Sequence, residues 1–197
     1  MSEENTQNNK ERFLSLCKSI ERKGIDELML WLEKSDFYAS PASTRFHGAK
    51  PGGLLEHSLN VYDELVRILE AYPEIHADRD SVVIASLFHD LCKVNSYAVE
   101  KRNRKNELGQ WESYDAYKTE EKVCYGGHGS KSVFILQNFI KLTLDEAVAV
   151  NAHMGSWDGN KDVGKVYEQF PFAWALHMAD EAATFIKESN KSERSTS

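Results

Sequence analysis

The sequence contains little cysteine and no long apolar run. Its three cysteines, Cys17, Cys92 and Cys124, are an odd number, lie far apart and form no CxxC pair. This spacing argues against a disulfide framework and a cysteine zinc site, and we interpret Cys92 as a small packing residue. No stretch approaches the roughly 18 apolar residues of a membrane span, and the polar N-terminus, MSEENTQNNKER, does not resemble a signal peptide. These absences predict a cytoplasmic protein with no membrane partner.

The chain also lacks an excess of positive charge. It has 24 Lys and Arg residues against 31 Asp and Glu residues, which gives a net charge of −7. Proteins that follow extended nucleic acid usually cluster Lys and Arg on one surface, so we do not expect such a partner. A small phosphorylated substrate in a locally basic pocket remains compatible with this charge. The sequence gives no indication of the oligomeric state.

What the chain does contain is the composition of one globular domain. Hydrophobic residues make up 41% and charged residues 28% of its 197 residues. Both ends are polar, so we predict disordered tails over residues 1–9 and 190–197. Residues 10–189 are then expected to form a single domain.

Helical periodicity dominates this domain, which predicts a mostly α fold. A break is expected at Gly24, a cap at Asp80 or Ser81, and a capping box from Thr143 to Glu146. The predicted helices span residues 10–34, 54–72, 82–94, 127–140, 144–154 and 171–189.

Residues 96–125 interrupt the helical pattern. The stretch SYAVEKRNRKNELGQWESYDAYKTEE alternates in polarity, has no apolar helical stripe and contains ELGQ as a turn. We therefore predict a β-hairpin inserted into the helical domain. If it folded over a functional site, this insertion could act as a specificity lid.

One apolar run, SLFHDLCKVN, carries three ionisable residues, His89, Asp90 and Lys93. A charged group that is buried without a partner loses its solvation by water, at a cost on the order of several kcal/mol. Such groups therefore need a partner. One explanation is a buried His–Asp hydrogen bond. The other is a metal ion held by both residues.

Further metal-ligating residues fall on other predicted helices, each of a type that binds transition metals. They are His57 in GGLLEHSLNV, His128 in GHGSKSVFIL, His153 in AVAVNAHMG and Asp180 in ALHMADEAA. Each one alone has an ordinary structural explanation, but the set together favours a metal site.

The order of His57, then His89 and Asp90, then Asp180 resembles the H…HD…D signature of the HD-domain superfamily of metal-dependent phosphohydrolases. The stretch HDLCK also resembles the HD-x-x-K segment of that family, and the similar segments run from about residue 41 to 188. The resemblance implies an HD-domain helical bundle.

His128 and His153 extend the resemblance to the binuclear H…HD…H…H…D branch. It implies one metal held by His57, His89, Asp90 and Asp180, and a second held by His128 and His153, with Asp90 bridging the two. The implied cofactors are one or two divalent transition metal ions, chosen among Fe, Mn, Co, Ni and Zn.

The chain departs from the HD-GYP branch, because AHMGSWDG lacks both its second histidine and its GYP motif. It is more similar to compact HD hydrolases of bacteria and their prophages. The resemblance implies hydrolysis of a phosphoester, either a nucleotide or another small phosphorylated compound, by a metal-activated water.

Asp90 and Lys93 are the expected catalytic residues. Lys93 lies three positions after Asp90, so its ammonium either reaches the substrate phosphate or forms an ion pair with Asp90. Arg45, His47 and Lys131 are the expected substrate-binding residues, since Arg45 and His47 lie on the loop just before the first-ligand helix and Lys131 follows His128.

Two alternatives remain open. The same ligand order is similar to that of myo-inositol oxygenase and related di-iron oxygenases, which need redox-active iron and consume O₂. A nucleotide-binding sensor that keeps the site without turnover is the third hypothesis.

Overall fold

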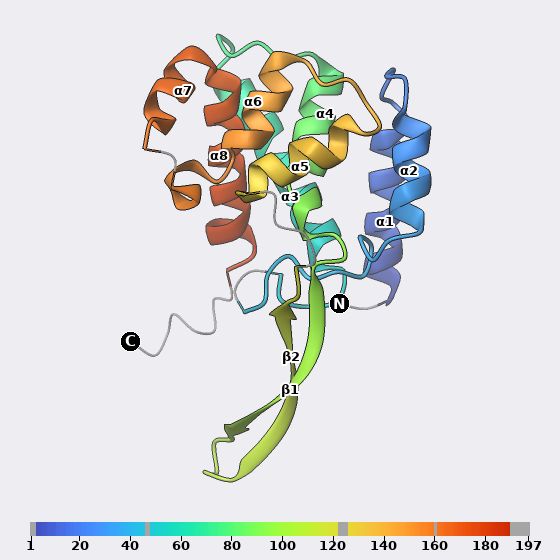
Figure 1. Cartoon of the computed structure of the whole chain (residues 1–197), viewed down its shortest axis with the longest axis vertical. Helices are drawn as coiled ribbons and strands as arrows, with labels where there is room; N and C mark the ends of the chain where they lie inside the picture. The colour runs from blue at the N-terminus through green and yellow to red at the C-terminus, as the bar shows by residue number, and fades with distance from the viewer. Residues whose placement is uncertain (1–2, 46–47, 122–125, 160, 190–197) are drawn as a thin grey trace.

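The computed structural model describes residues 3–45, 48–121, 126–159 and 161–189, and these form a helical body from which one β-hairpin projects (Figure 1). The predicted mostly α fold with a hairpin insertion is confirmed. The helices are α1 (Glu3–Cys17), α2 (Ile25–Glu33), α3 (Gly53–Ala71), α4 (Arg79–Phe88), α5 (His128–Gln137), α6 (Leu144–Ala152), α7 (Val163–Gln169) and α8 (Pro171–Ala182). Shorter segments are the 3₁₀ turns η1 (Leu91–Lys93) and η2 (Gly155–Asp158) and the π-helical turn η3 (Ala183–Lys187). The strands are β1 (Tyr97–Lys105) and β2 (Trp111–Thr119).

Helix α3 lies at the centre of the body, packed against α4 and α8. The apolar residues of α3 from Leu54 to Leu65 are mostly buried, and every residue of α4 from Ser81 to Phe88 is buried as well. The ring of Phe88 meets Phe13 edge-on at 5.9 Å, and Phe13 also packs on Phe37 at 5.1 Å. This aromatic cluster holds the C-terminal end of α4 in place, directly before the His89–Asp90 pair.

The predicted break at Gly24 is confirmed. Gly24 has a φ of 94°, a conformation that favours glycine. A Cβ atom at this position would also collide with the backbone carbonyl of Phe139. The chain can therefore turn from α1 to α2 while lying against the end of α5.

Two helix starts differ from the predictions. Residues 3–9, assigned to the tail by their polarity, form the first turns of α1, with Gln7 donating to Glu11 one turn later at 2.7 Å. A polar exposed helix carries no apolar stripe, so polarity alone did not identify it. The cap of α4 is Asp78, whose side chain accepts a hydrogen bond from Ser81 N at 2.8 Å, and not Asp80 or Ser81.

A buried polar network, which we call the Arg22 network, joins the N-terminal ends of α4 and α6. Arg22 donates to both carboxylate oxygens of Glu146, at 2.8 and 3.2 Å. The fully buried Glu146 also accepts from Ser81 Oγ at 2.7 Å and from the backbone N–H of Thr143 at 2.7 Å. The last contact belongs to the predicted capping box, which is confirmed.

The hairpin pairs β1 with β2 in antiparallel register, from Tyr97 opposite Thr119 to Lys105 opposite Trp111. At its tip, the side chain of Asn106 accepts hydrogen bonds from the backbone N–H groups of Leu108 and Gln110, each at 3.0 Å. The hairpin points away from the helical body (Figure 1). It therefore does not cover the interior of the body as a lid would.

Lys131 of α5 connects the hairpin to the body. Its buried ammonium lies 3.2 Å from Ser96 Oγ, just before β1, and 2.7 Å from Glu121, just after β2. Within the described ranges, no helix is long and apolar enough to cross a membrane.

Candidate metal centre

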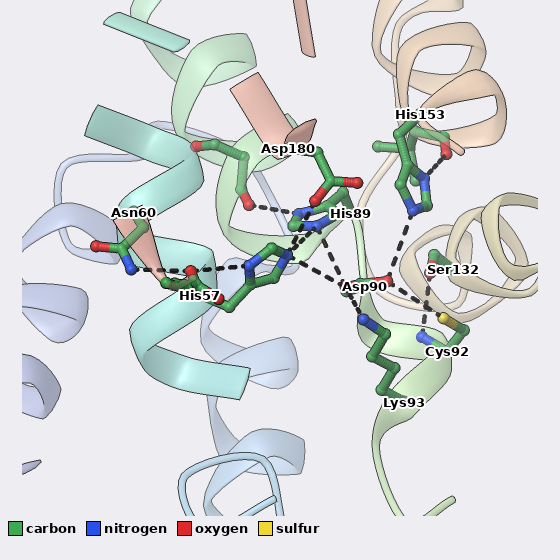
Figure 2. Close-up of polar contacts among 12 residues, drawn as sticks. His57, Asn60, His89, Asp90, Cys92, Lys93, Ser132, His153 and Asp180 are labelled. Atoms are coloured by element: carbon green, nitrogen blue, oxygen red, sulfur yellow. Dashed lines mark hydrogen bonds and ion pairs between the residues drawn. The ribbon is translucent and has the colours of Figure 1, made fainter. Parts of the chain in front are cut away.

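Three histidines and two aspartates, which lie in or directly after four different helices, meet inside the body (Figure 2). His57 lies in the second turn of α3, and Asp180 lies in α8. His89 and Asp90 directly follow α4, and His153 directly follows α6. Two of the helices thus contribute through residues that follow their C-terminal ends, and the other two through residues within the helix.

The ligand atoms of these residues are close enough to share a cation. His57 Nε2 lies 3.1 Å from Asp180 Oδ1 and 3.3 Å from His89 Nε2. His89 Nε2 lies 3.3 Å from Asp90 Oδ2. Two overlapping groups, His57–His89–Asp90 and His89–His153–Asp180, each have ligand atoms within 4.8 Å of one another. This donor set of imidazole and carboxylate is typical of Zn, Fe, Mn and Co sites.

The carboxylate of Asp90 faces in two directions. Its Oδ2 atom lies 3.6 Å from His57 Nε2 and 2.6 Å from Lys93 Nζ. Its Oδ1 atom lies 3.6 Å from His153 Nε2 and accepts a weak contact from the Cys92 thiol at 3.7 Å. Lys93 thus makes the ion pair that was one of its two predicted roles.

Burial and charge act against each other in this cluster. Burial disfavours a charged His57 ring, yet the carboxylates of Glu188 and Asp180 outweigh it and raise the pKa of His57 to about 10. Burial likewise opposes ionisation of Asp90, but Lys93 and His89 hold the pKa of Asp90 well below its usual range. The site carries a surplus of negative charge, which a bound proton or a metal cation can neutralise.

The three rings present the same nitrogen to the centre. Nδ1 of His89 donates to the carbonyl of Ser86 at 2.8 Å, and Nδ1 of His153 donates to the carbonyl of Val150 at 2.7 Å. Nδ1 of His57 lies 3.1 Å from Glu188 Oε1. With Nδ1 occupied in each case, Nε2 is the ligand atom.

The fully buried Nε2 atom of His153 has no hydrogen-bond partner within 3.5 Å in the described part of the chain, and its contact with Asp90 Oδ1 is a longer one at 3.6 Å. Buried nitrogen atoms are seldom left without a partner, because the lost solvation costs about 1–3 kcal/mol. A metal ion is a suitable partner for this atom, so the residues present fit the metal that the donor set indicates.

The path of the chain at His89 and Asp90 differs from the prediction. The sequence predicted one helix through residue 94, whereas α4 ends at Phe88 and Asp90 has φ −106° and ψ 23°, outside the helical range. The chain then turns into η1. This change of direction, more than helical spacing, sets the angle between the two side chains.

His128 does not join this cluster. It is exposed at the first position of α5 and belongs to neither ligand group of the described chain. His153, expected to share a second metal with His128, instead lies with His89 and Asp180. The described residues thus supply one compact ligand cluster, and a second metal at His128 stays a prediction.

Two of the predicted substrate-binding residues, Arg45 and Lys131, lie outside the cluster. Arg45 is exposed on the loop before α3, and His47 lies outside the described residues. Lys131 is engaged by Glu121 and Ser96, as described above. Burial raises the pKa of the Cys92 thiol, which keeps it protonated and agrees with a packing role.

Sequence analysis did not identify Glu188 and Asn60, which hold His57 from outside the cluster, whereas a packing role beside the ligands was expected for His177. Glu188 and Asn60 contact each other beside His57, with Asn60 Nδ2 donating to Glu188 Oε1 at 2.8 Å. Asn60 lies three positions after His57 on the same helix face, which is a signal the sequence does contain. The ring of His177 bonds to the carbonyl of His153 at 2.6 Å and stacks on Tyr167, so it supports the turn that carries His153. A Cβ atom at Gly155, in that turn, would lie 2.7 Å from the His177 ring.

The fold and the site together define a helical protein with a buried histidine–aspartate metal centre. The HD domain family matches residues 54–194, which is most of the chain, and the chain belongs to this family.

A stretch of 81 residues is also 27% identical to the dihydroneopterin 2′,3′-cyclic phosphate phosphodiesterase of Methanocaldococcus jannaschii. The similar stretch covers 40% of this chain and 30% of that protein. No solved structure matches the chain significantly.

Proposed function

We propose that this protein is a metal-dependent phosphohydrolase that cleaves a small phosphorylated compound. The observation that carries the proposal is the convergence of three Nε2 atoms and two carboxylates in a buried cluster with surplus negative charge. Membership of the HD family and the similarity to a phosphodiesterase support the same reaction class.

His57, His89, Asp90 and Asp180 would hold one divalent ion, with His153 beside them. Such an ion, when bound, lowers the pKa of water and polarises a phosphoryl oxygen. A second ion held by Asp90, His153 and His128 is part of the proposal, since His128 stands at the start of the helix next to the cluster.

Lys93 is the residue of this chain that we assign to the substrate. Burial disfavours its charge, but Asp90 raises the pKa of Lys93, so the ammonium stays protonated. Its side chain is 12% exposed, and its ammonium lies 2.6 Å from Asp90 Oδ2 at the cluster. From there it would hold the phosphate and offset its negative charge.

We infer that the substrate is a phosphodiester, because the similar archaeal protein is named for the cyclic phosphodiester it cleaves. A nucleotide or a nucleotide-like cyclic phosphate is the substrate class we favour. Arg45 and His47 remain the proposed contacts to its phosphate on the loop before α3, whereas Lys131 is the weakest candidate because it is already paired.

Metal analysis of freshly purified protein, followed by product detection across phosphomonoesters, linear phosphodiesters and 2′,3′-cyclic phosphates, tests the proposal. We expect bound transition metal and hydrolysis with Mn²⁺ or Co²⁺ under anaerobic conditions. Bound iron with O₂ consumption and no hydrolysis would instead support the oxygenase alternative. Ligand binding without any product would support the sensor.

A further inference from the structure

A carboxylate lies directly behind the first metal ligand. Glu188 Oε1 is 3.1 Å from His57 Nδ1, on the side of the ring opposite to the ligand cluster, and the Glu188 side chain is only 7% exposed. Since a carboxylate oxygen can only accept, Nδ1 is the donor. Asn60 donates to the same Glu188 oxygen at 2.8 Å, which fixes the carboxylate relative to α3. Figure 2 shows Asn60 beside His57 on that helix.

His57 differs in this respect from the other two histidines of the cluster. The Nδ1 atoms of His89 and His153 donate to backbone carbonyls three residues earlier in their own segments. These contacts come from the local turn of the chain and carry no charge. His57 alone among the three is oriented by an ionisable side chain, which comes from 131 positions later in the sequence.

The π-helical turn η3 explains how Glu188 reaches this position. Eight residues of regular α-helix, at about 100° per residue, would leave Glu188 roughly 80° around the axis from Asp180. The backbone N–H of Glu188 bonds instead to the carbonyl of Ala183, five residues earlier, at 3.0 Å. This wider turn needs an additional residue, which lowers the rotation per residue and brings Glu188 back toward the face that carries Asp180. Both acids then act on His57, Asp180 at Nε2 and Glu188 at Nδ1.

We propose that Glu188 is a positioning residue that accepts the Nδ1–H of His57, fixes the tautomer with Nε2 facing the cluster, and strengthens the binding of a divalent cation. The inference deepens the proposed function and rests on the metal site it assigns. A carboxylate behind a histidine ligand raises the basicity of the ring, and loss of such a partner typically costs about 10- to 100-fold in metal affinity.

The test is the dissociation constant of Co²⁺, measured by chelator competition on the full chain, together with the visible absorption spectrum of the Co²⁺ protein. Glu188→Gln keeps the shape of the side chain and removes its charge. We expect it to weaken Co²⁺ binding about tenfold or more and to shift the absorption bands. The matched control is Lys187→Gln, at the neighbouring position in the same turn. It breaks the ion pair of Lys187 with Glu64 of α3 (3.1 Å) and should leave the Co²⁺ affinity and the absorption spectrum unchanged.

An unchanged Co²⁺ affinity and spectrum in Glu188→Gln, even with a lower melting temperature of the metal-free protein, would overturn the inference and leave Glu188 as an anchor of the C-terminal turn. If Glu188→Gln does not fold, Asn60→Ala replaces it. This variant should weaken Co²⁺ binding less and in the same direction, and an unchanged affinity would contradict the inference. Failure of the unsubstituted protein to bind Co²⁺ would instead overturn the metal site itself.

Discussion

Helices α4 and α6 each connect two buried polar clusters, one with its hydrogen bonds satisfied and one without. Their N-terminal ends meet in the Arg22 network, and their C-terminal ends lead into the ligand cluster through His89 and His153. In the Arg22 network, the carboxylate of Glu146 receives hydrogen bonds from Arg22, Ser81 and Thr143. In the ligand cluster, His153 Nε2 has no hydrogen-bond partner within the described chain and the pKa of His57 is raised to about 10.

The difference separates a structural cluster from a functional one. A buried ion pair whose lone pairs are satisfied needs nothing more and holds the fold together. A buried group of acids and rings with surplus negative charge is stable only when something positive joins it. Both clusters bury charged groups. They differ in that the Arg22 network satisfies its buried groups with partners from the protein, whereas the ligand cluster does not.

The sharpest way to break this comparison is His89→Ala. Loss of an imidazole at the centre of the cluster should abolish metal retention and activity, a larger effect than the about 10- to 100-fold cost of an outer partner. Helical content measured by circular dichroism should stay close to that of the parent protein. Retention of metal at the parent stoichiometry would show that His89 is not a ligand.

Arg22→Met tests the other end of the helices. It leaves the fully buried Glu146 without its cation, and breaking a buried pair costs about 3–5 kcal/mol. Because the Arg22 side chain is 22% exposed, we expect the lower end, about 3 kcal/mol by urea unfolding. Folded Arg22→Met should still bind metal. The control is Arg12→Met, whose pair with Asp63 is exposed and should contribute less than about 1 kcal/mol.

The pH dependence of the metal-free protein sharpens the comparison further. The pKa of His57 is raised in the folded state from 6.5 to about 10, so its contribution to stability is fully present below pH 6.5 and is lost as the pH rises toward 10. One pKa unit corresponds to about 1.4 kcal/mol, so we expect a loss on the order of 4 kcal/mol in urea unfolding between pH 6.5 and pH 10. Arg22→Met should keep this slope, and His57→Gln should lose it. An equal slope in His57→Gln would assign the effect to another group.

The smallest effect is expected for a shortened hairpin in which residues 102–114 are replaced by Asn-Gly between Lys101 and Asp115. This turn suits a two-residue hairpin, and the removed residues pair chiefly with each other across the strands. The free energy of unfolding should change by less than about 1 kcal/mol, because an isolated two-stranded hairpin is itself marginally stable. Co²⁺ affinity should not change. A large loss of affinity would make the hairpin part of the site.

Much of this fold follows from local patterns in the sequence. Helix α3 carries a continuous apolar stripe, the capping box at Thr143 marks the start of α6, and alternation with a turn predicts the hairpin. The early end of α4 at Phe88 was not predictable in this way, because the apolar pattern continues through Leu91 and Val94 while the backbone turns. Tertiary packing decided that end, and periodicity cannot detect it.

The ligand residues of the site could be selected from the sequence. His57, His89, Asp90, His153 and Asp180 were all selected from the sequence, and the structure brings these five together. Their selection succeeded because each is an ionisable residue within an apolar segment, and such residues are uncommon enough to indicate a functional site.

Glu188 gave no such signal, since it lies in the polar sequence FIKESN, where an acid is ordinary. Its contact with His57 depends on a π-helical turn, and no local pattern in the sequence indicates one.

The ammonium of Lys93 beside Asp90 also determines how the site reaches electroneutrality. When all three rings bind metal and are therefore neutral, the carboxylates of Asp90, Asp180 and Glu188 together with Lys93 leave a formal charge of −2. One divalent ion cancels this charge, so the singly loaded centre has no net attraction for an anion beyond its local dipoles. A second divalent ion would leave the centre at +2, equal and opposite to a phosphate dianion, so occupancy by one or two ions sets which anions the centre attracts.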